Sequence, residues 1–189
     1  MTTARLGVAV AVAGFVSFVC LVVFFAVGGP FGAINDVGNA VTGLLAGALA
    51  VRLRRGLGPT VVAVVGAAVT VVGTVLVMSN ATGFFLAGLV SGLGFALIGI
   101  WLIVANARSV VPARLRTLGV IAGAVMALGL VDIVGIAAGT DDMDSAGWVQ
   151  YGGVNWLGTY VLMPIWSLWL ARTLTVGSPG GTELLDRRG

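Results

Sequence analysis

The chain has 189 residues, of which 59% are apolar and only 9% are charged, and its mean hydropathy is +1.11. A soluble domain must present far more polar surface to water, so this composition excludes a soluble protein and indicates an integral membrane protein. The basic residues, all ten of them arginine, form no long run and are not interleaved with aromatic residues, which argues against nucleic acid as a partner.

The inventory of reactive side chains narrows the chemistry further. The chain has no His and no Lys, and its single cysteine, Cys20, lies within an apolar run. These absences exclude histidine-ligated haem, a Schiff-base cofactor and an internal disulfide, and they argue against a structural zinc site. The sequence also lacks a nucleophile elbow, a phosphate loop and a dinucleotide fingerprint. We therefore predict no catalytic residue, no metal ligand and no cofactor.

Six apolar segments are each long enough to cross a bilayer core of about 30 Å, which takes roughly 20 helical residues. They cover residues 6–27, 33–51, 59–78, 82–105, 118–138 and 153–171. The first follows Arg5 as a signal peptide would, but its apolar run is longer than that of a signal peptide, so we interpret it as a retained span. The predicted fold is an all-α bundle of six transmembrane helices over residues 1–174, with a short disordered tail at 175–189.

The arginines predict the orientation of these spans. Each arginine either precedes the first span or follows the second, fourth or sixth, so all of them fall on one side of the membrane. The positive-inside rule places that side, and both termini with it, in the cytoplasm. The opposite side receives Asp36 and the acidic segment 141–144. We therefore predict a multi-pass protein of the cell membrane, and the bias toward Ala, Gly, Val and Arg indicates a prokaryotic source.

The last span carries two further signals. Aromatic side chains near its ends are expected to anchor it at both interfaces. They are Trp148, Tyr151 and Trp156 at the outer end and Trp166 and Trp169 at the inner end. Pro164 predicts a kink near the inner leaflet, because proline cannot donate the hydrogen bond that a continuous helix requires.

Small residues recur at four-residue spacing in three of the predicted spans. The pairs are Gly43 and Gly47, Gly88 and Gly92, and Gly119 and Gly123. Such pairs let helix backbones approach closely, which is how helices pack in lipid. The facing helix can belong to the same chain, to a second copy or to another membrane protein, and the spacing does not distinguish these alternatives.

Asp132 is the carboxylate that lies furthest inside a predicted span. It falls about 21 Å along the fifth span and about 9 Å short of its outer boundary, too deep for so short a side chain to reach water. On a helix it shares a face with Ala122, Gly129 and Gly135, so we expect it to point into protein. Helix capping does not explain an anion toward the carboxyl end of a span, and an ionisable residue at this depth is a candidate functional residue.

Polar residues of two other spans are expected at the depth of Asp132. They are Asp36 and Asn39 in the second span, and Asn155 and Thr159 in the sixth. If the three spans pack together, these residues and Asp132 form an outward-facing pocket of oxygen ligands that suits a proton or a cation.

Simpler interpretations remain for several polar residues. Asn35, Asp36 and Asn155 lie near predicted helix starts, where Asn and Asp are favoured caps. The acidic segment 141–144 fits either a divalent-ion site or a solvated turn, and the turn is favoured because the spacing lacks the glycine and closing Glu of a calcium loop.

Three functions are compatible with this sequence. The one that needs the fewest assumptions is a non-enzymatic membrane protein with a structural, regulatory or accessory role, whose partner is the lipid bilayer. The second is a small proton- or cation-coupled transporter or channel that uses Asp132. The third, an intramembrane enzyme acting on lipid, lacks a candidate nucleophile. A water-accessible cavity that reaches Asp132 would favour the second function over the first, whereas a dry, fully hydrogen-bonded Asp132 would count against it.

Overall fold

The computed structural model describes residues 1–107, 111–142 and 154–176, and each element in these ranges is a helix. The elements are α1 (Thr3–Val27), α2 (Phe31–Leu53), α3 (Leu57–Met78), α4 (Phe84–Ala107), α5 (Ala113–Ala127), η1 (Leu128–Val131), α6 (Asp132–Ala138), η2 (Gly158–Leu162) and α8 (Met163–Val176). Five helical stretches are long and apolar enough to span a membrane, namely α1, α2, α3, α4 and the run of α5, η1 and α6. The all-helical fold is thereby confirmed for the described residues, and several of its helices are long and apolar enough to lie in a membrane.

The last helical stretch is interrupted, so it is not among those five. Residues 154–157 are helical and lead into η2, which is π-helical, and then into α8. We call residues 154–176 the final helix. It extends to Val176, so residues 175 and 176 belong to a helix and not to the predicted tail. The remainder of that tail, residues 177–189, lies outside the described ranges.

The other helices begin and end close to the predicted spans. α1 and α3 end at Val27 and Met78, as expected, and α2 begins at Phe31. The turn between α1 and α2 is made by Gly28 and Gly29, whose φ angles are 70° and 75°, a region that favours glycine. Local sequence signals thus placed the helices well, because apolar length and turn glycines act over short distances.

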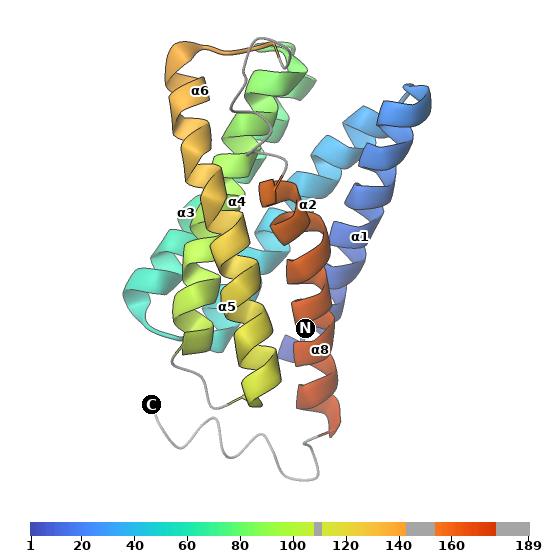
Figure 1. The fold of residues 1–189 in the computed structure, drawn as a ribbon. Helices are drawn as coiled ribbons and strands as arrows, with labels where there is room; N and C mark the ends of the chain where they lie inside the picture. Colours follow the sequence, from blue (N-terminus) through green and yellow to red (C-terminus); the bar gives the residue numbers. More distant parts are fainter. Residues whose placement is uncertain (108–110, 143–153, 177–189) are drawn as a thin grey trace.

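The helices pack in a ring that follows the chain order (Figure 1). α1 packs on α2, α2 on α3, α3 on α4, and α4 on α5 and α6, while the final helix closes the ring between α5 and α1. The described arginines all belong to one end of the bundle, which we call the arginine end: Arg5, Arg52, Arg54, Arg55, Arg114, Arg116 and Arg172. The opposite end, where α6 ends and Asp141 follows, is the acidic end.

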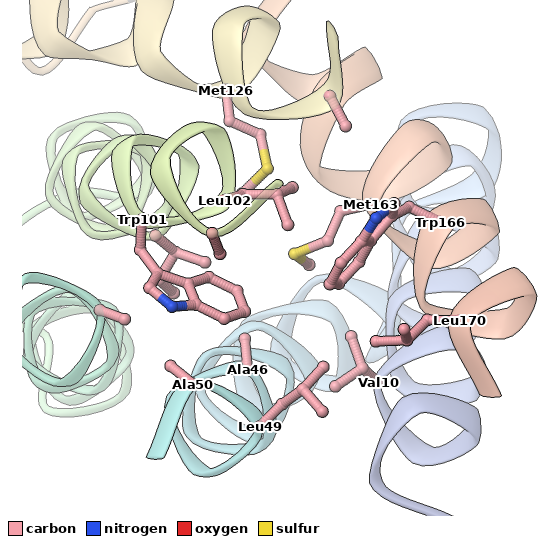
Figure 2. Packing of buried hydrophobic residues seen from close by; sticks show 14 of the residues in the cluster. Val10, Ala46, Leu49, Ala50, Trp101, Leu102, Met126, Met163, Trp166 and Leu170 are labelled. Carbon is pink, nitrogen blue, oxygen red and sulfur yellow. The ribbon is translucent and has the colours of Figure 1, made fainter. Parts of the chain in front are cut away.

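Large apolar side chains fill the interior of the ring. Figure 2 shows Trp101 of α4, Met126 of α5 and Met163 and Trp166 of α8 gathered above Ala46 and its neighbours on α2. The rings of Trp101 and Trp166 meet edge to face, with centroids 6.2 Å apart. The side chains of this interior come from α1, α2, α3, α4, α5 and α8, and they pack closely against one another.

Trp166 is a core residue, so its interpretation as an interface anchor is wrong. It is only 3% exposed, and its indole Nε1–H donates a hydrogen bond to Asn106 Oδ1 at 3.0 Å. That buried acceptor gives the indole a partner away from the interface, which the sequence pattern did not reveal. Trp156 and Trp169 are 37% and 39% exposed and remain compatible with anchoring, whereas residues 148 and 151 lie outside the described ranges.

Close glycine contacts hold the helices of this one chain together. Five of the six glycines from the predicted pairs face another helix so closely that an added Cβ would press on it: Gly43, Gly47, Gly92, Gly119 and Gly123. The first two face α3, and the last two face α4. Gly88 differs, since it is exposed and an added Cβ would meet nothing within 4 Å. The structure therefore assigns most of this pattern to packing within the chain.

The proline of the final helix is accommodated by its π-helical turn. η2 ends at Leu162, and Pro164 follows immediately as the second residue of α8. Because proline lacks the N–H that would bond to the preceding turn, the backbone widens there instead of continuing as a regular α-helix. The ring of Pro164 packs on α1, where a Cβ on Gly14 would lie 2.6 Å from its Cγ. The predicted distortion thus takes the form of a π-turn.

The carboxylate of Asp141 caps α4 from another part of the chain. Its Oδ2 accepts a hydrogen bond from the backbone N–H of Gly83 at 2.7 Å, and its Oδ1 accepts one from Leu86 at 3.1 Å. Gly83 directly precedes α4 and has no side chain to serve as a cap, so Asp141 satisfies N–H groups that would otherwise lack an acceptor. Asp141 is thus exposed but bonded, and residues 143 and 144 of the acidic segment lie outside the described ranges.

Loss of this cap is expected to destabilise the bundle moderately. Asp141→Ala should lower the free energy of unfolding by about 1 kcal/mol, the usual effect of removing a helix cap. Asp141→Asn keeps an oxygen acceptor and is the matched control, with a smaller loss expected. Thermal unfolding in detergent, followed by circular dichroism, measures both variants. Identical stability of Asp141→Ala and the wild type would contradict a role for the cap.

Candidate functional site

Asp132 points into the protein, as its helical face predicts. It begins α6, directly after the 3₁₀ turn η1, and only 4% of its surface is exposed. Ala122, Gly129 and Gly135, the small residues expected on its face, are buried as well. Small side chains on this face let α6 and η1 pack directly against α4. The position of Asp132 therefore follows from helix periodicity and from the small residues around it.

Two glycines make room for Asp132 and for Asn155 of the final helix. A Cβ on Gly92 of α4 would collide with Asp132 Oδ2 and would lie 3.3 Å from Asn155 Nδ2. A Cβ on Gly129 would collide with the same Asn155 nitrogen. The hydroxyl of Thr159 donates a hydrogen bond to Asn155 Oδ1 at 3.4 Å. We call this group of Asp132, Asn155 and Thr159, with the two glycines, the Asp132 centre.

Asp132 is a largely buried residue whose carboxylate makes no hydrogen bond or ion pair among the described residues. The described residues provide it with neither a hydrogen-bond donor nor a cation, although Asn155 lies beside it. A buried carboxylate that lacks both is costly, and it becomes tolerable when it takes up a proton or a cation. No described donor or cation therefore offsets the charge of Asp132 at this helix contact.

A second polar group ties α1, α2 and the final helix together. Asn35 Nδ2 donates to the carbonyl of Ser17 at 3.0 Å and to the hydroxyl of Tyr160 at 3.3 Å. The Tyr160 hydroxyl donates to Asn39 Oδ1 at 2.9 Å, and Asn39 Nδ2 donates to Asn35 Oδ1 at 3.2 Å. We call Asn35, Asn39 and Tyr160 the amide latch. Its three side chains close a ring of hydrogen bonds, so each of them is satisfied within the bundle.

The structure divides the predicted five-residue pocket. Asp132, Asn155 and Thr159 lie together in the Asp132 centre, whereas Asn39 belongs to the amide latch. Asp36 forms no hydrogen bond through its carboxylate among the described residues, and its backbone carbonyl accepts one from Thr74 of α3 at 2.7 Å. α2 packs mainly against α1 and α3, so the carboxylates of Asp36 and Asp132 belong to different helix contacts.

The capping interpretation of Asn35 and Asp36 is wrong. α2 begins at Phe31, its N-cap is Pro30, and no side chain bonds to the N–H groups of that cap. Asn35 therefore lies in the second turn, where its amide reaches Ser17 and Tyr160 instead. For Asn155, the residues that precede its helix lie outside the described ranges, and its amide oxygen accepts the hydroxyl of Thr159.

The π-turn directs adjacent residues of the final helix to the two polar groups. Thr159 and Tyr160 both lie in η2, yet Thr159 bonds within the Asp132 centre and Tyr160 bonds within the amide latch. The ring of Tyr160 also stacks on Phe18 of α1, with centroids 6.1 Å apart. π-turns recur at functional sites of helical proteins. In this one, the consecutive residues Thr159 and Tyr160 connect the Asp132 centre to the amide latch through the backbone.

Sequence reasoning missed Tyr160 and the part that Asn35 plays in the latch. One signal could have found Tyr160, because a tyrosine in the middle of a span needs a partner for its hydroxyl. Its actual partner, Asn39, is 121 residues away in sequence, and no local pattern connects them. Asn106 was missed for the same reason, since its role depends on Trp166.

Breaking the amide latch is expected to destabilise the protein. Tyr160→Phe keeps the ring but removes the hydroxyl, which leaves the amides of Asn35 and Asn39 each short of one partner. We expect a loss of about 1 kcal/mol, within the range measured for hydrogen bonds between membrane helices. Ser79→Ala is the control, since the hydroxyl of Ser79 bonds only to carbonyls of its own helix. Equal melting temperatures for Tyr160→Phe and Ser79→Ala would contradict the latch.

The fold and this site define an all-helical protein with several helices apolar enough to span a membrane and with a largely buried aspartate at a helix contact. Comparison with protein-family models, with curated proteins and with solved structures found no match to this chain.

Proposed function

We propose that the chain is a six-span protein of the cell membrane, with both termini in the cytoplasm. The final helix of residues 154–176 supports the sixth span, since 23 helical residues reach roughly 35 Å. The gathering of the described arginines at one end supports the orientation. Its partner is the lipid bilayer, which the exposed apolar side chains of α1 and α3 would contact.

Within this topology, the chain acts as a small, non-enzymatic ion transporter that carries a proton or a monovalent cation. The observation that supports this function is the carboxylate of Asp132, which belongs to a largely buried residue and has no hydrogen bond or ion pair among the described residues. Ion binding would neutralise it, and the bound ion would then reside inside the helix bundle. Asp132 has no hydrogen bond among the described residues, which supports an ion-binding role over a purely structural one.

The residues around Asp132 have distinct parts in this proposal. Asp132 holds the ion, and Asn155 lies beside it with its orientation set by Thr159. Gly92 and Gly129 have no side chains of their own, so the Asp132 carboxylate and the Asn155 amide fit against them. The π-turn next to this centre is a place where the final helix can change its hydrogen bonding at low cost, which alternating access requires.

Ion flux in proteoliposomes tests the proposal. The purified full chain is reconstituted, proton, sodium and potassium gradients are imposed in turn, and ion-sensitive dyes report flux. We expect flux from the wild type, and we expect Asp132→Asn to reduce it to the level of empty vesicles. Asp141→Asn is the matched control, because it makes the same carboxylate-to-amide change outside the Asp132 centre, and it should keep the wild-type rate. No flux from the wild type under any gradient would reject the transporter.

A structural or accessory role is the second candidate, and the amide latch favours it. All three latch side chains are satisfied, and they join α1, α2 and the final helix, as expected of residues that fix helix register. This role predicts no ion flux and a destabilised Asp132→Asn protein. The flux assay and a melting curve of the same two proteins therefore separate the two functions.

A further inference from the structure

The atoms that face Asp132 distinguish between the ions that it could bind. Asn155 Nδ2 and Asp132 Oδ2 both lie against Gly92, and the same nitrogen also lies against Gly129. The amide oxygen of Asn155 points to Thr159 and accepts its hydroxyl at 3.4 Å. The atom of Asn155 nearest to the Asp132 oxygen on this surface is thus its nitrogen, which is no cation ligand, and its amide oxygen is already engaged.

A metal cation needs a different set of neighbours. Hard cations are held by several oxygen ligands, about six to eight for calcium and six for magnesium. The Asp132 centre contains one carboxylate, and no group of three or more His, Cys, Asp or Glu side chains occurs among the described residues. A proton requires a single acceptor oxygen, which Asp132 supplies alone.

The helices around Asp132 contribute no second titratable group. α4 and η1 contain no ionisable side chain, and Asp132 is the only one in α6. On the final helix, Tyr160 is bonded within the amide latch and Arg172 belongs to the arginine end. The arginines of α5, Arg114 and Arg116, belong to that end as well. Among the described helices around this contact, the Asp132 carboxylate is therefore the group that can exchange a proton.

We infer that the ion carried by this protein is a proton and that Asp132 binds it as a neutral carboxylic acid. This inference rests on the transporter function proposed above and specifies its ion. In the binding step, an oxygen of the Asp132 carboxylate forms an O–H bond with a proton delivered by water from one side of the membrane. In the release step, that O–H bond breaks and water on the other side accepts the proton. No redox partner takes part.

The test combines ion selectivity with a spectroscopic signal. Proteoliposomes of the full chain receive either a pH gradient at equal sodium and potassium, or a sodium or potassium gradient at equal pH. Infrared difference spectra between acidic and alkaline pH detect the C=O stretch of a buried carboxylic acid. We expect flux with the pH gradient alone, and an acid band that is lost in Asp132→Asn, kept in Asp141→Asn and unchanged by saturating sodium.

The possible outcomes separate this inference from the proposed function. Sodium or potassium flux that depends on Asp132, without proton flux, overturns the proton assignment and leaves the transporter intact. An acid band that disappears when sodium is added also overturns it, because the cation then displaces the proton. Absence of flux with every ion overturns the transporter and this inference together.

Discussion

Gly99→Ala is expected to lower the free energy of unfolding by about 3 kcal/mol, at the upper end of the usual effect of overpacking a core. Gly99 of α4 lies against Gly123 of α5, and the two backbones touch. A Cβ on Gly99 would lie 2.7 Å from the Gly123 carbonyl oxygen and 2.7 Å from Met126 Cβ. The Gly123 carbonyl belongs to the backbone, so it cannot move aside as the end of a flexible side chain could. The helices α4 and α5 must therefore separate to admit one methyl group.

Gly88→Ala is the matched control for this prediction. It makes the same change on the same helix, but an added Cβ at Gly88 would meet nothing within 4 Å. Alanine also favours helix over glycine, by about 1 kcal/mol in water, so this variant should be neutral or slightly more stable. Thermal unfolding in detergent, together with the yield of monodisperse protein, measures both variants. Equal losses for Gly88→Ala and Gly99→Ala would contradict the contact between α4 and α5.

Asp132→Asn is expected to be at least as stable as the wild type, although we also expect it to abolish the proposed transport. The wild-type carboxylate is buried without a donor or a cation among the described residues, so removing its charge removes a cost. On scales of membrane insertion, an Asp at the centre of a helix costs about 3 kcal/mol. We expect the free energy of unfolding to rise by only about 1 kcal/mol, because the new amide also needs hydrogen-bond partners. Residues that serve a function are commonly kept although they lower the stability of the protein.

The sign of the stability change is the informative result. A structural Asp132 would make contacts that its removal breaks, so Asp132→Asn would melt below the wild type. Tyr160→Phe is the reference for that behaviour, since it breaks a satisfied group. Melting curves of the three proteins in one detergent at neutral pH give the comparison. A loss in Asp132→Asn as large as that in Tyr160→Phe would place Asp132 among the structural contacts.

The amide latch shows where prediction from the sequence stopped. Asn35 and Asn39 are one turn apart, and their shared helix face was visible in the sequence. Their bond to Tyr160 was not, because it depends on which helix packs beside α2 and on the π-turn that aims the tyrosine. The same holds for Trp166, whose buried acceptor Asn106 lies on another helix. In each case the partner is distant in sequence, and helical periodicity describes one helix at a time.

The exposure of Asp141 was predicted from the sequence, but its hydrogen bonds were not. Its charge and its place after a span were enough to predict an exposed acidic turn, and it is exposed. Its bonds to the N–H groups of Gly83 and Leu86 require the start of α4 to lie beside the end of α6. Chain order alone does not specify that neighbourhood.

The sequence by itself determined that this protein is helical and membrane-embedded, where its long helices lie, and that Asp132 faces protein. These properties follow from hydropathy, from the length of apolar runs and from the periodicity of a single helix, all of which act locally. Only the tertiary structure decided which helices meet, and hence that Asp132 lies beside Asn155 while Asn39 bonds to Tyr160. In lipid, apolar surface does not select partners, so close packing at glycines and a few buried hydrogen bonds make that choice.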